Sequence, residues 1–210
     1  MSLWVKICGV RNPEEARACV EAGADAVGVN FYEKSVRHVT LEQAAEVVDA
    51  LPTDFPVYGV FVDAARQEIE SVIGVTGIRG VQLHGSELLA DAADWDLPVL
   101  FARSVVEPLD KSLRAVLTEP ARYRDKLRLL LDGPGGGGQG RGFDAGILER
   151  SGLTDLSECI IAGGLTPSNV SAAVRHWRPF GVDTAGGVET APGMKDAGLI
   201  REFVDHARIA

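Results

Sequence analysis

The sequence predicts an α/β fold, a single closed (β/α)8 TIM barrel of minimal length over residues 1–210. Short β-branched and apolar runs alternate eight times with amphipathic helical segments, as in parallel sheets with crossover helices. The 210 residues are close to the lower limit for eight such units in one barrel. A doubly wound open sheet is the second choice, because no dinucleotide-binding glycine pattern follows the first strand.

The eight expected strands are short and rich in Val, Ile, Leu and Phe. They cover residues 5–8, 26–31, 57–61, 80–83, 99–103, 127–132, 159–162 and 180–184. Each is followed by a helical segment rather than by a tight turn, so neighbouring strands are expected to run parallel. The C-terminal ends of all eight strands should therefore meet at one mouth of the barrel.

Capping residues and apolar stripes predict the helices between the strands. Asn12 and Pro13 open the first helix, with acidic residues behind them, and Gly23 ends it. Thr40 and Gln43 form a capping-box pattern for the second helix. The remaining helices are expected after Asp63, from Ser86, around Leu113, after Asp144, from Thr166-Pro167 and around Leu199.

The composition excludes several classes of protein. Lys and Arg number 21 and Asp and Glu number 30, so the net charge is −9. Nucleic acids and anionic membranes bind basic faces, so neither is expected as a partner. The sequence shows no signal peptide and no apolar run near the ~20 residues of a membrane span. Its three cysteines lack metal-ligand spacing, so we expect no metal, reduced thiols and a cytoplasmic location.

Polar residues follow the expected strands at the barrel mouth, where active sites of this fold lie. They include Cys8, Arg37, His84, Asp132 and Asp183. A thiol, a carboxylate and an arginine that face one mouth form a set suited to acid–base chemistry on an anionic substrate.

Two further basic residues are expected near the same mouth. Lys6 shares a strand face with Cys8, because side chains alternate along a strand, and its ammonium group would lower the thiol pKa. Arg103 is interpreted as the partner of a structural ion pair.

Glycine is in excess, with 24 residues in the chain. Gly163 and Gly164 follow the seventh strand, and Gly186 and Gly187 follow the eighth. These two loops of a barrel commonly hold a phosphate on backbone N–H groups, so even an acidic chain can bind one phosphate there. Seven more glycines lie in the loop 133–142, which we interpret as a mobile cover.

Motifs along the whole chain resemble those of the phosphoribosylanthranilate isomerase family. They are Lys6-Ile7-Cys8-Gly9, the segment 34–39, Val81-Gln82-Leu83-His84-Gly85, Leu130-Leu131-Asp132 with 142–144, the segment 162–170, and the three segments 181–183, 187–189 and 192–196. They occur in the family's order and at the expected strand ends.

The resemblance implies an Amadori rearrangement without a cofactor. N-(5′-phosphoribosyl)anthranilate would become 1-(2-carboxyphenylamino)-1-deoxyribulose 5-phosphate, in tryptophan biosynthesis. It implies that Cys8 is the general base and Asp132 the general acid, which requires a thiolate and a protonated carboxyl group. Arg37 would pair with the anthranilate carboxylate, the glycine loops would hold the phosphate, and Asp183 and His84 would also contact the substrate.

The chain departs from the family pattern at two places. Ala185-Gly186 replaces two serines in the eighth loop, so two hydroxyl groups that could bind phosphate are absent. Val36 and His38 replace a proline and a tyrosine beside Arg37. Two alternatives therefore stay open, a paralogous isomerase of another sugar-phosphate amine in secondary metabolism and a weakly catalytic barrel that acts as a binding module. The sequence leaves the oligomeric state open.

Overall fold

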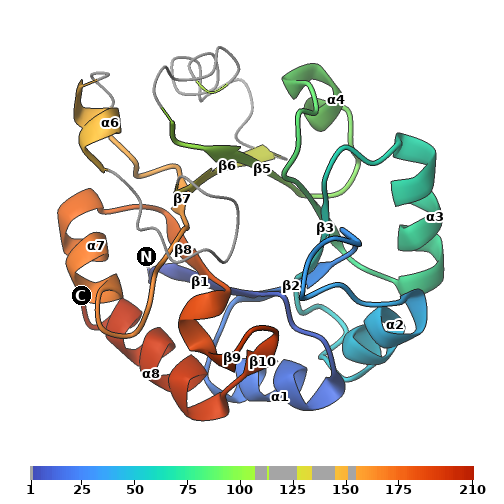
Figure 1. Ribbon diagram of the computed structural model, residues 1–210, viewed down its shortest axis with the longest axis horizontal. Coiled ribbons are helices and arrows are strands. Elements are labelled where there is room, and N and C mark those ends of the chain that lie inside the picture. Colours follow the sequence, from blue (N-terminus) through green and yellow to red (C-terminus); the bar gives the residue numbers. More distant parts are fainter. Residues whose placement is uncertain (1, 107–112, 114–126, 134–144, 151–154) are drawn as a thin grey trace.

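Eight parallel strands close into one barrel, and each strand pairs with the next in sequence order (Figure 1). The computed structural model describes residues 2–106, 113, 127–133, 145–150 and 155–210. The strands are β1 (Trp4–Cys8), β2 (Ala26–Asn30), β3 (Val57–Phe61), β4 (Gly80–Leu83), β5 (Val99–Ser104), β6 (Leu127–Asp132), β7 (Ile160–Ile161) and β8 (Gly181–Thr184). The predicted closed (β/α)8 barrel is confirmed.

Helices form a ring outside the barrel (Figure 1). They are α1 (Pro13–Glu21), α2 (Leu41–Asp49), α3 (Arg66–Thr76), α4 (Leu89–Ala93), α6 (Ala145–Arg150), α7 (Val170–Trp177) and α8 (Ala197–Arg208). A short 3-10 helix, η2 (Gly186–Val188), follows β8 and leads into an antiparallel hairpin of β9 (Glu189–Ala191) and β10 (Met194–Lys195). No helix in the described part of the chain is long and apolar enough to cross a membrane.

Two predicted caps are present in the structure. Asn12 Oδ1 accepts a hydrogen bond from the Glu15 amide at 2.9 Å and begins α1. At α2, Thr40 accepts from the Gln43 amide while the Gln43 side chain accepts from the Thr40 amide, which completes the capping box. These three hydrogen bonds satisfy N–H groups that the start of a helix leaves unpaired.

Other predicted helix starts are wrong. Asp63 does not cap α3, which begins at Arg66. Its Oδ1 instead accepts from the Ser86 amide at 2.6 Å and from the Ser86 hydroxyl at 2.7 Å. Ser86 is therefore held in a loop, and α4 begins only at Leu89. This tie links the loops after β3 and β4, a tertiary contact that local capping rules do not anticipate.

The start of α7 also differs from the prediction. The helix begins at Val170, and Thr166-Pro167 belongs to a turn before it. Asn169 Oδ1 closes that turn by accepting from the Thr166 amide at 2.8 Å. The expected helix around Leu113, apart from Leu113 itself, and the expected cap Asp144 lie outside the described residues.

Apolar side chains form two separate cores on the two faces of the sheet. The larger core packs the strands against the helices and includes Cys19, which is fully buried as predicted. The smaller core lies in the barrel interior and consists of Ala26, Tyr58, Leu100, Ala102, Leu130, Ile160 and Ala162. Every second residue of a strand faces inward, so the last inward residue of each strand lies at the mouth.

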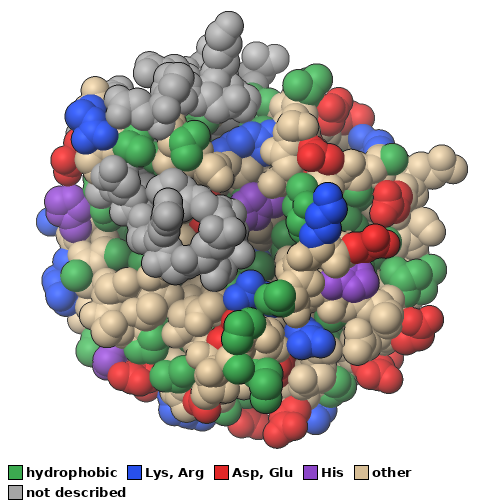
Figure 2. All heavy atoms as spheres, in the orientation of Figure 1, with side chains coloured by type: hydrophobic (Ala, Val, Ile, Leu, Met, Phe, Trp, Pro, Cys, Tyr) green, Lys and Arg blue, Asp and Glu red, His purple; other side chains and the backbone are tan. Residues whose placement is uncertain are grey.

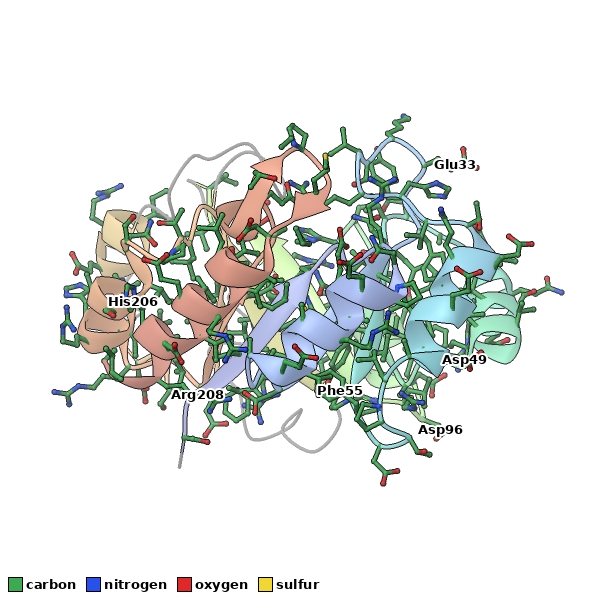
Figure 3. The ribbon with its side chains drawn as sticks, turned by 90° about the horizontal axis from the view of Figure 1, so that it is seen from below. Glu33, Asp49, Phe55, Asp96, His206 and Arg208 are labelled. Carbon is green, nitrogen blue, oxygen red and sulfur yellow. The ribbon has the colours of Figure 1, made fainter. Side chains whose placement is uncertain are left out.

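Aromatic rings pack together at the N-terminal end of the barrel. Trp4 lies edge-to-face with Tyr58 at a centroid distance of 6.3 Å and beside Phe180 at 6.1 Å. Gly80 and Gly181 leave room for these rings, because a Cβ on Gly80 would lie 2.5 Å from Tyr58 and one on Gly181 would lie 2.9 Å from Trp4. The side view shows the two ends of the barrel. Glu33, which follows β2, lies at the C-terminal end of the strands, and Phe55 and Asp96, which precede β3 and β5, lie at the N-terminal end (Figure 3).

Candidate active site

Cys8 ends β1 at the mouth, and glycines make room around it. Cys8 pairs in register with Gly28 of β2. A Cβ on Gly28 would lie 2.8 Å from Cys8 Sγ and 3.2 Å from Lys6 Nζ, so the thiol and the ammonium share the space that this glycine leaves. Gly9 turns the chain away with a φ of 77°, and Arg37 lies where its Cβ would be. Steric constraints therefore act at both ends of the motif Lys6-Ile7-Cys8-Gly9. The Lys6 and Cys8 side chains need the space beside Gly28, and the Arg37 side chain needs the absence of a Cβ at Gly9.

A buried ion pair lies directly behind Cys8. Lys6 is fully buried, and its Nζ donates to Asp183 Oδ1 of β8 at 2.8 Å. The barrel register sets this contact, because Lys6 and Asp183 are paired residues of neighbouring strands. The prediction that Lys6 and Cys8 share a face is confirmed, and the partner of Lys6 is the predicted substrate contact Asp183.

Burial and charge act in opposite directions on the Cys8 thiol. Burial raises its pKa, the Lys6 ammonium lowers it, Asp183 raises it and Lys195 lowers it, and the net shift is upward. For Lys6, burial lowers the pKa, but the charges of Asp183 and Cys8 outweigh burial and raise it. The resting state is therefore a thiol beside a firmly charged ammonium group.

Asp132 ends β6, which is separated from β1 by β7 and β8 in the closed barrel. Its side chain is buried, and its Oδ2 lies 3.2 Å from Nε2 of His84, the residue after β4. This contact is not aligned as a hydrogen bond, so both atoms lack a hydrogen-bond partner among the described residues. A buried carboxyl oxygen and an imidazole nitrogen without partners are groups poised for a polar ligand.

The seventh loop packs against Asp132. Gly163 has a φ of 90° and Gly164 one of 71°, a left-handed geometry that suits glycine. A Cβ on Gly163 would meet the Gly133 backbone and would lie 2.8 Å from Asp132 Oδ1. Asn169 donates to the Gly164 carbonyl at 2.9 Å and fixes the loop from the side of α7.

The eighth loop lies directly against the seventh. Gly187 touches the Leu165 carbonyl so closely that no Cβ would fit, and Thr184 Oγ1 donates to the same oxygen at 2.7 Å. The structure therefore brings the two predicted glycine pairs together. Gly186 is exposed, and Gly163 and Gly164 are partly exposed, so their backbones are accessible to a ligand.

Arg37 reaches the site from the loop after β2 and is already paired. Its Nε and Nη2 each donate to the Glu189 carboxylate at 2.7 Å, in a bidentate contact. Lys195 Nζ donates to Glu189 at 2.7 Å and to the Ala185 carbonyl at 2.9 Å. The sequence motifs contain Glu189 and Lys195 but do not predict their contact with Arg37. Glu189 lies 152 residues beyond Arg37, and such a long-range contact has no local sequence signal.

These contacts shift the pKa of each group in the cluster. Burial raises the pKa of Glu189, but the hydrogen bonds and charges of Arg37 and Lys195 prevail and lower it to about 2. Burial lowers the pKa of Lys195, and the attraction of Glu189 offsets only part of this shift. Glu189 is therefore ionised over the physiological range.

Other features near the mouth are structural. Arg103 lies over the Phe101 ring at 3.6 Å and 3.9 Å from the Glu87 carboxylate, so its interpretation as an ion-pair partner is confirmed. A cavity of about 410 Å³ lies beside α1 and α8, behind the β9–β10 hairpin, and Glu14 and Glu15 line it. Arg11 and Lys195 also line it, so the charges of its lining balance and none of the predicted site residues lies there.

The space-filling view looks onto the mouth. Basic side chains and a histidine are visible near its centre, whereas most acidic side chains lie toward the rim (Figure 2). Within the described residues, no group of three or more His, Cys, Asp or Glu side chains is placed to hold a metal ion. The loop 134–142, part of the predicted cover, lies outside the described residues.

Comparison with known proteins agrees with this geometry. Residues 5–206 match the family model described as N-(5′-phosphoribosyl)anthranilate (PRA) isomerase. An enzyme of this name from Myxococcus xanthus is 45% identical over 99% of this chain and 97% of its own length. Another from Pseudomonas fluorescens is 39% identical over 97% of each chain.

Solved structures give the same result. The phosphoribosyl anthranilate isomerase of Thermotoga maritima is 34% identical and superposes with a TM-score of 0.82 over 99% of this chain and 100% of that one. A further phosphoribosyl anthranilate isomerase structure, in complex with reduced 1-(o-carboxyphenylamino)-1-deoxyribulose 5-phosphate, has a TM-score of 0.80 at 34% identity. With its closed barrel and its match over nearly the whole length, this chain belongs to the N-(5′-phosphoribosyl)anthranilate isomerase family.

Proposed function

We propose that this chain isomerises N-(5′-phosphoribosyl)anthranilate to 1-(2-carboxyphenylamino)-1-deoxyribulose 5-phosphate, with Asp132 as general acid and Cys8 as general base. One observation carries the assignment of roles. Cys8 and Asp132 end strands on different sides of the barrel, both are buried, and both end at the same mouth. A sugar ring between them would meet an acid on one side and a base on the other.

The first step opens the ribose ring. Asp132 donates its proton to the ring oxygen, and the bond from that oxygen to C1′ breaks while the anilino nitrogen lone pair forms a C=N bond. The products are a protonated Schiff base and an Asp132 carboxylate. His84 Nε2 lies 3.2 Å from Asp132 Oδ2, beside that developing negative charge.

The second step transfers a proton from carbon. The Cys8 thiolate removes the C2′ proton, and the electron pair of the C–H bond moves toward the positive nitrogen to give a neutral enolamine. The enolamine becomes the aminoketone when C1′ gains a proton and the C2′ hydroxyl loses one. Lys6 and Lys195 stabilise the thiolate by charge, and Lys6 is held in place by Asp183.

The ends of the substrate require two anion sites. The backbones of Gly163, Gly164, Gly186 and Gly187 suit the phosphate, because the two loops meet and are accessible. Arg37 suits the anthranilate carboxylate, with Glu189 holding two of its three nitrogens. Asp183 gives one oxygen to Lys6, and we assign its other oxygen to a ribose hydroxyl.

The structure favours neither alternative function. A paralogue for another amine would need a changed aryl end, yet Arg37 is present and rigidly held. A binding module would need neither Cys8 nor Asp132 at the mouth. The three free cysteines further support the reduced, cytoplasmic setting that we propose.

Genetic complementation, with a rate assay, tests this function. We expect the gene to restore growth without tryptophan in a strain that lacks only this isomerase, and the purified protein to consume the substrate, followed by anthranilate fluorescence. Folded protein that neither rescues growth nor changes the fluorescence would contradict the proposal and favour a binding module.

A further inference from the structure

A compact charge cluster lies beside the groups that transfer protons. We call Arg37, Glu189 and Lys195 the Glu189 cluster. Glu189 accepts from Arg37 through both carboxylate oxygens, from Lys195 through Oε1 and from the Gly193 amide through Oε2 at 3.1 Å. This carboxylate therefore has little capacity left for another donor.

The charges of the Glu189 cluster do not cancel. Arg37 and Lys195 carry two positive charges and Glu189 carries one negative charge, which leaves one positive charge in excess. The Lys195 side chain is fully buried, so its ammonium group has no access to a ligand. Glu189 takes Nε and Nη2 of Arg37, and the remaining nitrogen, Nη1, is the one that can face a ligand.

We propose that Lys195 is a positioning residue for substrate recognition, which neutralises Glu189 and so leaves the charge of Arg37 for a carboxylate on the ligand. The inference rests on the proposed function, because it takes the ligand to carry an aryl carboxylate and a phosphate. Without Lys195, Arg37 and Glu189 would form a neutral pair. A second carboxylate at Arg37 would then have to share that single cation with Glu189, and two carboxylates in a buried site repel each other strongly.

The same ammonium group reaches toward the other end of the substrate. Lys195 Nζ donates to the Ala185 carbonyl, directly before the Gly186-Gly187 loop. One buried residue thus contacts both the carboxylate that holds Arg37 and the start of the loop assigned to phosphate. A test must therefore separate recognition of the carboxylate from the general placement of the loop.

Two ligands that differ only in the aryl carboxylate make this separation. One is reduced 1-(o-carboxyphenylamino)-1-deoxyribulose 5-phosphate, and the other is its phenylamino counterpart. Calorimetry gives the ratio of their dissociation constants for the unmodified chain, for Lys195→Met and for Lys34→Met. Lys34 is an exposed lysine of the Arg37 loop and serves as the matched control. A change of loop placement alters both affinities, whereas the ratio isolates the carboxylate.

We expect loss of the carboxylate to weaken binding by about tenfold or more in the unmodified chain and in Lys34→Met, as for a charge-assisted hydrogen bond. In Lys195→Met the ratio should fall to about threefold or less. An unchanged ratio in folded Lys195→Met would overturn the inference and leave the proposed function intact. An unmodified chain that binds neither ligand would contradict the proposed function itself.

A pH series gives a test that does not depend on the folding of Lys195→Met. Cys8 interacts electrostatically with both Arg37 and Lys195, and Lys6 and Asp183 lie on its other side. From α1, Glu15 accepts from the Lys195 amide, and Cys19 also interacts with Lys195 but has a pKa raised by burial to about 12; Arg11 donates to the Gly193 carbonyl. The series therefore uses Cys8→Ser to remove thiol ionisation. Burial lowers the pKa of Lys195, whereas Lys6 keeps its charge because its pKa is raised. The ratio should fall as the pH rises from 7 to 10.5 and Lys195 loses its proton. A ratio that stays constant over this range would overturn the inference.

Discussion

At the scale of single residues, the proposed reaction needs two groups in opposite protonation states. Cys8 must lose a proton to act, although burial raises its pKa, and Asp132 must keep one. The positive charges of Lys6 and Lys195 lower the pKa of the Cys8 thiol and so favour the thiolate against the effect of burial. Each of these cations is itself held by a carboxylate, Asp183 or Glu189.

Removing either proposed proton-transfer group should slow turnover strongly. Cys8→Ala leaves no base and Asp132→Asn leaves no acid, so kcat should fall by about 10²–10⁴-fold in each variant. The fluorescence assay measures the rates, and circular dichroism with thermal unfolding shows whether the variants remain folded. Near-normal rates in either folded variant would refute its role.

The charges behind Cys8 should shift the thiol pKa in opposite directions. Lys6→Met removes a cation and should raise the pKa, whereas Asp183→Asn removes an anion and should lower it. The pH dependence of alkylation at Cys8, located by mass spectrometry, measures this pKa. Cys19 and Cys159 interfere little, because burial raises both of their pKa values to about 12. Shifts of the same sign in the two variants would contradict this electrostatic account.

At the scale of elements, strand register and loop glycines position the site. The register pairs Lys6 with Asp183, which brings the two charges together, and it pairs Cys8 with Gly28, which leaves room for the thiol. Loop contacts complete the arrangement, because the Leu165 carbonyl joins the seventh loop to the eighth.

One glycine substitution should impair activity, whereas another should stabilise the fold and leave activity normal. In Gly28→Ala, the new methyl group would meet Cys8 Sγ and Lys6 Nζ, so kcat should fall about tenfold or more through misplacement of the base. Gly74→Ala adds a methyl group in open space on exposed α3 and should stabilise the fold by ~0.5–1 kcal/mol with normal activity. Activity assays and urea unfolding measure both effects, and full activity in Gly28→Ala would refute the steric argument.

At the scale of the whole molecule, buried ion pairs join distant parts of the chain. Lys6 and Asp183 are 177 residues apart, and Arg37 and Glu189 are 152 residues apart. These pairs tie the first two strand–helix units to the last strand and its hairpin. The N- and C-terminal parts of the barrel are therefore coupled through the same residues that serve the site.

This coupling makes the fold sensitive to acid. Glu189 has a folded-state pKa lowered to about 2 from its usual 4.5, so its contribution to stability is present above pH 4.5 and is lost as the pH falls toward 2. We expect this carboxylate to account for about 2 kcal/mol of the acid-induced loss. Urea unfolding of the unmodified chain and of Glu189→Gln between pH 2 and 7 measures it. Equal pH dependence in both would contradict the assignment.

Local sequence pattern predicts the architecture of this protein and the polar residues at its mouth. Alternating apolar runs predict eight strands, and the C-terminal strand ends lie at the mouth. Cys8 and Asp132, which end strands, and His84, which follows one, could therefore be placed there from the sequence. The caps at Asn12 and Thr40 were also predictable, because capping acts within three residues of one helix start.

Only the tertiary structure decided which charges meet. Asp63 resembles a helix cap in sequence but binds Ser86, and Arg37 resembles a free anion site but is held by Glu189 and, through it, by Lys195. Such pairings depend on barrel closure, which brings the first and last strands together, and on loops whose geometry no local rule sets. Electrostatic energies depend on distance and burial, and both exist only once the barrel has closed.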